Sequence, residues 1–144
     1  MQVIRNLEQE AAALVGWGVR VMLLAPDSTA DRMQARIAGL GGVVERQGEL
    51  FSALDSLIDD PAGYGLFVVD VDGYGGVKAM SRAMAMLGEV RLRVPAIFVS
   101  RDCAEQIFPD DRHEPVCLRA PMSAVALRVG LEHALRDRLR LRAA

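Results

Sequence analysis

The chain has 144 residues, of which 51% are hydrophobic and 25% charged, and its formal net charge is -2 at pH 7. This size suits one domain with a core that needs no disulfides or metals, and the composition excludes a disordered chain. The charge excludes a general nucleic-acid binder, and no run of apolar residues is long enough to span a membrane. The N-terminus lacks the basic region of a signal peptide, and Cys103 and Cys117 fit neither a disulfide framework nor a zinc site. We therefore expect a cytoplasmic protein with free thiols.

Helix and strand patterns alternate through the first half of the chain. Apolar spacing and the Gly and Pro breaks predict, in order, helix 3–15, strand 19–24, helix 28–38, strand 42–46 and helix 49–58. The second of these helices starts at Ser28, which is followed by Asp31 in the pattern of a capping box. We expect 1–18 to be an N-terminal helical extension and 19–144 to form the main domain.

The second half opens on four apolar residues, 66–69, that lead directly into Asp70 and a glycine-rich loop. A short apolar run bounded by a turn is typical of a strand buried on both faces. The elements predicted after it are helix 77–87, strand 95–100, a short helix at 102–107, strand 116–118 and a long helix capped by Ser123.

Five strands that alternate with five helices predict an α/β fold, because right-handed crossovers place helices on both faces of a parallel sheet. We expect a flavodoxin-like, doubly wound five-stranded sheet of order 2-1-3-4-5, with the N-terminal helix as an addition. In such sheets ligands collect at the carboxyl ends of the strands, and here strands one and three are neighbours at the switch point. Asp27 is therefore expected beside Asp70.

With these landmarks the sequence resembles the receiver (CheY-like) domain of two-component response regulators over about residues 19–135. The resemblance rests on Asp70 at the end of strand three, Ser100 at the end of strand four and the Ala120-Pro121 step after strand five. It implies that Asp70 is the phosphoacceptor and that Ser100 is the hydroxyl residue of the phosphorylation site.

Several family positions differ in this chain. The acidic pair that holds Mg²⁺ in receivers is replaced by Ala25 and Pro26, the lysine by Ala120, and the aromatic switch residue by Cys117. Phosphoryl transfer to a carboxylate depends on Mg²⁺ and a cation to offset negative charge. The remaining candidate metal ligands are Asp27, Asp70 and Asp72. The differences indicate a degenerate receiver, or pseudo-receiver.

The resemblance implies a stand-alone bacterial signalling protein of a two-component phosphorelay, which is not an enzyme and acts through protein contacts. The partner would be a histidine kinase, a phosphotransfer protein or an output protein; no nucleic acid, membrane or cofactor is implied. One alternative is a working receiver that a histidine kinase phosphorylates on Asp70 with Mg²⁺. A second is a flavodoxin-like binder of a small ligand such as a nucleotide or flavin, although 27–31 lacks a hydroxyl-rich phosphate loop.

Two terminal helices suggest self-association. The last helix repeats leucine every four residues, and the N-terminal helix also carries an apolar stripe (Leu127, Leu131, Leu135 and Leu139 form the leucine ladder). Exposed apolar stripes of this size mark interfaces, so we expect a homodimer that uses these helices.

Overall fold

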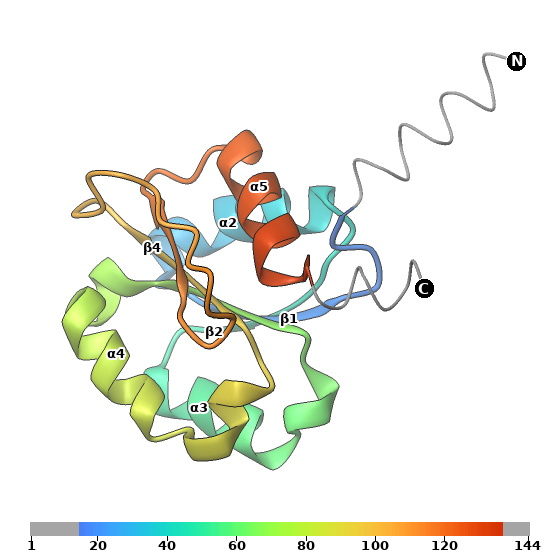
Figure 1. Ribbon diagram of the computed structural model, residues 1–144, viewed down its shortest axis with the longest axis vertical. Helices are drawn as coiled ribbons and strands as arrows, with labels where there is room; N and C mark the ends of the chain where they lie inside the picture. Colours follow the sequence, from blue (N-terminus) through green and yellow to red (C-terminus); the bar gives the residue numbers. More distant parts are fainter. Residues whose placement is uncertain (1–14, 137–144) are drawn as a thin grey trace, which may run out of the picture.

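The computed structural model describes residues 15–136, so the helix expected at 3–15 lies, except for its last residue, outside the described part of the chain. Five parallel strands form one sheet of order β2-β1-β3-β4-β5 (Figure 1). Their bounds are Arg20–Leu24 (β1), Val43–Gln47 (β2), Leu66–Asp70 (β3), Ala96–Ser100 (β4) and Val116–Arg119 (β5). The expected flavodoxin-like sheet is confirmed.

Helices cover both faces of this sheet, as Figure 1 shows. One face carries α2 and α5, and the other carries α3 and α4. The bounds are Asp27–Gly39 (α2), Leu50–Asp59 (α3), Val77–Ala85 (α4) and Ala124–Ala134 (α5), and short 3-10 turns lie at Pro61–Gly63 (η1), Val71–Tyr74 (η2) and Gly88–Leu92 (η3). Within residues 15–136, no helix has the length and apolar character needed to cross a bilayer.

Strand β3 explains why the sheet needs both helical layers. Successive side chains of a strand point to opposite faces. Leu66 and Val68 pack under α2 and α5, whereas Phe67 and Val69 pack under α3 and α4. All of them are fully buried, and each large apolar side chain buried in this way contributes about 2 kcal/mol. The next residue, Asp70, is thereby fixed at the carboxyl edge.

The short helix predicted at 102–107 is wrong. Residues 101–115, all described, contain no helix and form one long loop. Ile107 instead pairs antiparallel with Cys117, with N–H···O distances of 2.8 and 2.9 Å. This loop is also joined to α5, because His133 contacts the carbonyl of Pro109 and Arg136 donates to that of Asp110. Pairing with the outer edge of β5 satisfies backbone groups that a helix would otherwise satisfy.

The capping box predicted at Ser28 is also wrong. Helix α2 begins at Asp27 with Pro26 as its N-cap, and no side chain caps it. Pro26 combines the φ of −67° that its ring imposes with an extended ψ of 158°, and the helix starts directly after it. Ser28 and Asp31 therefore lie inside the first turns.

The leucine ladder of the last helix is largely internal. Leu127, Leu131 and Leu135 are all buried under the chain's own sheet, and Leu139 lies outside the described residues. The side chains that α5 turns outward are Val125 and Val129, which are 74% and 41% exposed. A contact with another molecule through α5 would therefore use the two valines instead of the three described leucines.

Candidate functional site at the carboxyl edge of the sheet

Asp70 ends β3 and lies at the lip of a cleft of about 720 Å³. In the sheet it stands opposite Val99, one residue before Ser100. The cleft is lined from the loops that follow β1, β3, β4 and β5, as expected for the carboxyl ends of parallel strands. Asp70 is only 7% exposed, so its carboxylate needs hydrogen-bond partners within the protein.

Thr29 supplies such a partner. Its hydroxyl donates to Asp70 Oδ2 at 2.7 Å from the first turn of α2. Sequence analysis did not identify Thr29. The available signal was its place: it is a hydroxyl residue in the first helical turn after strand one, next to the switch point at which strands one and three meet.

Asp72 and Ser100 form a second pair. The Ser100 hydroxyl donates to Asp72 Oδ1 at 2.6 Å, and the backbone N–H of Arg101 donates to Asp72 Oδ2 at 2.8 Å. Ser100 in turn accepts a hydrogen bond from the N–H of Asp102 at 3.1 Å. Ser100 is 1% exposed, so this bonding is fixed at the end of β4. Both oxygens of Asp72 are thus held by donors from the end of β4 and the residue that follows it.

The three candidate metal ligands are not gathered into one site. Asp70 and Asp72 line the cleft, but Asp27 does not, and residues 15–136 contain no group of three or more His, Cys, Asp or Glu placed to hold a metal. Mg²⁺ prefers octahedral oxygen ligation. Asp70 accepts from Thr29, and both oxygens of Asp72 have protein donors. The described residues therefore do not bring Asp27, Asp70 and Asp72 together as one metal site.

Pro26 fills part of the space beside Asp70. It lines the cleft, and a Cβ added at Gly73 would lie 3.0 Å from the Cδ and Cγ of its ring. The loop after β3 therefore packs directly on the proline, and glycine at 73 permits that approach. The sequence resemblance places an acidic residue of receivers at this position, and proline has no side-chain oxygen.

Two arginines that the sequence analysis did not single out also line the cleft. Arg32 comes from α2 and Arg101 from the loop after β4. Arg32 could have been found from Thr29, because residues three apart share one face of a helix. Arg119, at the end of β5, does not line this cleft and instead borders a neighbouring depression with Glu105 and Ser123.

Tyr74 fixes the glycine-rich loop. Its hydroxyl donates to the carbonyl of Gly48 at 2.6 Å, which joins the loops after β2 and β3. Burial raises the pKa of Tyr74, and the negative charges of Asp70 and Asp27 raise it further. Gly75 and Gly76 have φ values of 94° and 92°, a region that favours glycine, and lead into α4.

The cysteines show no sign of reactivity. Cys103 is buried and its thiol contacts the carbonyl of Glu105 at 2.8 Å, while Cys117 lies in β5. Burial raises the pKa of both thiols. Reactive cysteines need a lowered pKa, so neither residue is a nucleophile candidate.

Comparison with known proteins places the fold. No protein-family model and no curated protein sequence matches the chain. Among solved structures, the receiver domain of sensor histidine kinase PA1611 from Pseudomonas aeruginosa PAO1, described with a magnesium ion in its active-site cleft, has a TM-score of 0.64 at 17% identity over 83% of this chain and 98% of that one. A receiver domain protein from Clostridium thermocellum has a TM-score of 0.66 at 11% identity over 85% and 98%.

The response regulator PhyR from Brucella abortus has a TM-score of 0.64 at 14% identity and is matched over 98% of this chain and 58% of its own length. At these identities the similarity establishes the fold. The described chain has the fold of response-regulator receiver domains, and the resemblance seen in the sequence is confirmed at that level.

Proposed function

We propose that this chain is a two-component signalling protein of the pseudo-receiver type, which acts through protein–protein contacts and does not depend on phosphorylation of Asp70. The fold supports the signalling role. The bonding in the cleft supports the absence of phosphotransfer.

The observation that carries the proposal is the hydrogen bonding of the Asp72 carboxylate. A hydroxyl at the end of a strand and the next backbone N–H together form a small anion site. Here Ser100 and Arg101 supply these donors, and the carboxylate of Asp72 occupies them. An incoming phosphoryl group would have to displace this carboxylate and approach Asp70 without an adjacent acidic pair. The chain's own anion therefore holds the loops after β3 and β4 in one arrangement.

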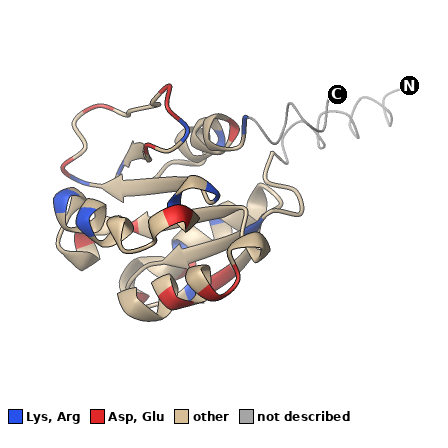
Figure 2. Cartoon of the chain, turned by 60° about the horizontal axis from the view of Figure 1, so that its bottom comes forward, with Lys and Arg blue, Asp and Glu red and all other residues tan. Residues whose placement is uncertain are grey.

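A protein partner has two kinds of surface available. Val125 and Val129 project from α5, and Ile107 is 53% exposed on the loop that is joined to α5. On the other face of the sheet, α3 carries acidic residues and the neighbouring α4 carries basic ones (Figure 2). Apolar side chains surrounded by polar ones mark interfaces, and divided charge favours oriented encounter. We assign the partner contact, including any homodimer contact, to the surface formed by Val125, Val129 and Ile107.

The main alternative remains a working phosphoacceptor. It is favoured by the position of Asp70 at a strand end and by Arg32 and Arg101, which line the same cleft and could offset phosphate charge. The two functions make opposite predictions for one measurement.

The test is incubation with acetyl phosphate and MgCl₂, followed by intact-mass spectrometry, with Asp70→Asn as the control. We expect the unmodified mass for both proteins. A receiver domain known to accept phosphate serves as the positive control for the reagent. A phosphate adduct on the parent chain that is absent from Asp70→Asn would overturn the proposal.

A further inference from the structure

A second cavity, of about 300 Å³, opens at the amino edge of the sheet. Gly65, directly before β3, and Pro95, directly before β4, both line it, so it lies at the opposite end of the strands from Asp70. Its volume is at the lower end of the range for small-molecule sites.

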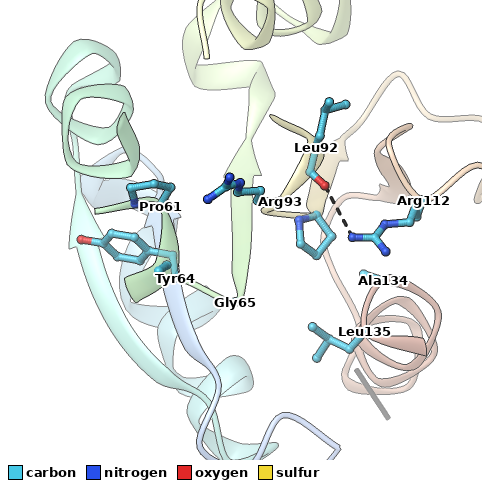
Figure 3. Close-up of a pocket in the computed structure, with 10 residues that line it drawn as sticks. Pro61, Tyr64, Gly65, Leu92, Arg93, Arg112, Ala134 and Leu135 are labelled. Atoms are coloured by element: carbon cyan, nitrogen blue, oxygen red, sulfur yellow. Dashed lines mark hydrogen bonds between the residues drawn. The ribbon is translucent and has the colours of Figure 1, made fainter. Parts of the chain in front are cut away.

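Segments from distant parts of the chain build this cavity (Figure 3). Pro61 and Tyr64 lie on one side, Leu92 lies across from them, and Ala134 and Leu135 of the α5 end close it below. The Tyr64 hydroxyl points away from the opening and contacts Glu45, so the aromatic ring is the part that faces the cavity. The ring of Tyr64, together with Pro61, Leu92 and Leu135, gives the cavity an apolar side.

Two guanidinium groups stand at the opening. Arg93 extends from η3 toward the side of Pro61 and Tyr64, and Arg112 reaches in from the loop 101–115, where it lies 3.5 Å from the carbonyl of Leu92 (Figure 3). None of the described residues that line the cavity is acidic. Guanidinium groups recognise carboxylates through paired, charge-assisted hydrogen bonds.

We propose that this cavity binds a small amphipathic carboxylate. The acid group of the ligand meets Arg93, and its apolar body packs among Pro61, Leu92 and Leu135. Neither the ion pair nor the apolar contact is sufficient by itself. An exposed ion pair contributes little in water, and the cavity is too small to bind a ligand by apolar contact alone. The combination defines the ligand class.

The test uses 3-phenylpropionate as the probe and the intact chain labelled with ¹⁵N. We expect saturable changes in amide chemical shift that cluster at Gly65, Leu92 and Ala134, with a dissociation constant of about 1 mM or tighter. The neutral 3-phenylpropionamide, which keeps the apolar body, and acetate, which keeps the charge, should each bind at least about tenfold more weakly.

Two arginine variants separate this site from general attraction to a basic surface. Arg93→Gln should weaken binding of the probe about tenfold. Arg91→Gln is the matched control, since Arg91 lies on the same turn, is exposed and does not line the cavity. It should change binding by less than about twofold.

Several results would overturn the proposal: no saturable shifts at about 10 mM probe, equal binding of the amide, or equal weakening by the two variants. Both arginines are exposed, so both variants are expected to fold, and circular dichroism checks this. The phosphotransfer assay and this titration are independent, and failure of one leaves the other proposal standing.

Discussion

The carboxyl and amino edges of the sheet differ in which charged side chains they carry and in what surrounds those side chains. At the carboxyl edge, Asp70 and Asp72 receive their hydrogen bonds from Thr29, Ser100 and the Arg101 backbone. At the amino edge, Arg93 and Arg112 stand beside a cavity with apolar walls. At the carboxyl edge the two carboxylates are thus held by bonds within the chain, although Arg32 and Arg101 line the same cleft. At the amino edge the described residues that line the cavity include arginines and no acidic residue.

The position of a residue and the bonds that it makes are therefore two separate observations. Asp70 lies at the carboxyl end of β3, where the sequence resemblance places the phosphoacceptor, and its surroundings decide what it can do. Asp70 is buried and accepts the Thr29 hydroxyl, so this bond joins the end of β3 to α2.

Thr29→Val should lower the free energy of unfolding by about 2 kcal/mol, because it removes a hydrogen bond to a buried carboxylate. Urea denaturation measures this change. Ser28→Ala, at the exposed neighbouring position, is the control and should have a much smaller effect. Equal unfolding free energies for the two variants would mean that the hydrogen bond from Thr29 to Asp70 does not stabilise the carboxyl edge.

Ser100→Ala should cost about 1 kcal/mol, since Asp72 loses a donor and the N–H of Asp102 loses an acceptor. Water replaces part of the loss because Asp72 is exposed. If the two residues act as a pair, Asp72→Asn and Ser100→Ala should be non-additive in a double-mutant cycle of unfolding free energies. Strictly additive changes in unfolding free energy would show that Ser100 and Asp72 contribute to stability independently.

Tyr64→Phe addresses the amino edge and should cost about 0.5–1 kcal/mol, because the hydroxyl bond to the half-exposed Glu45 is lost. The cavity keeps its aromatic wall in this variant. Binding of 3-phenylpropionate should therefore be unchanged within about twofold, when measured by the same titration. A large loss of binding would show that the hydroxyl, and not the ring, serves the cavity.

The pH dependence of stability should show the smallest difference. The hydrogen bond from Tyr64 lowers the pKa of Glu45 below its usual 4.5, so this contribution is present above that pH and is lost as the pH falls through the folded-state pKa. Burial raises the pKa of Tyr64 above its usual 10.0, so its contribution is present below that pH and is lost as the pH rises. Unfolding free energies of Tyr64→Phe should fall less steeply than the parent's at both extremes, and parallel curves would contradict this account.

The sheet could be predicted from the sequence because its signals are local. Apolar runs such as 66–69 end at polar residues or turns, and the alternation of strands with helices leaves few topologies. The segment 101–115 could not be predicted in this way. Its short helical pattern at 102–107 competes with pairing between Ile107 and Cys117, and that pairing depends on the free edge of β5, which is visible only in three dimensions.

The candidate site was predictable in position but not in bonding. The placement of Asp70 and Ser100 at strand ends follows from the strand patterns. The pairing of Ser100 with Asp72 depends on the register of β3 against β4 and on the turn after Asp70. Likewise, Thr29 reaches Asp70 only because α2 begins at Asp27, whereas the apparent capping signal at Ser28 suggested a later start.

The bridge between Ile107 and Cys117 also protects the molecule from its neighbours. β5 is the last strand of the sheet, and an uncovered outer strand is a template for pairing with other chains. Two backbone hydrogen bonds between Ile107 and Cys117, one donated by each residue, occupy part of that edge. Pro109 and Pro115, which lack an N–H, interrupt the segments beside it. The loop that replaces a helix in this chain therefore guards the sheet against edge-to-edge aggregation.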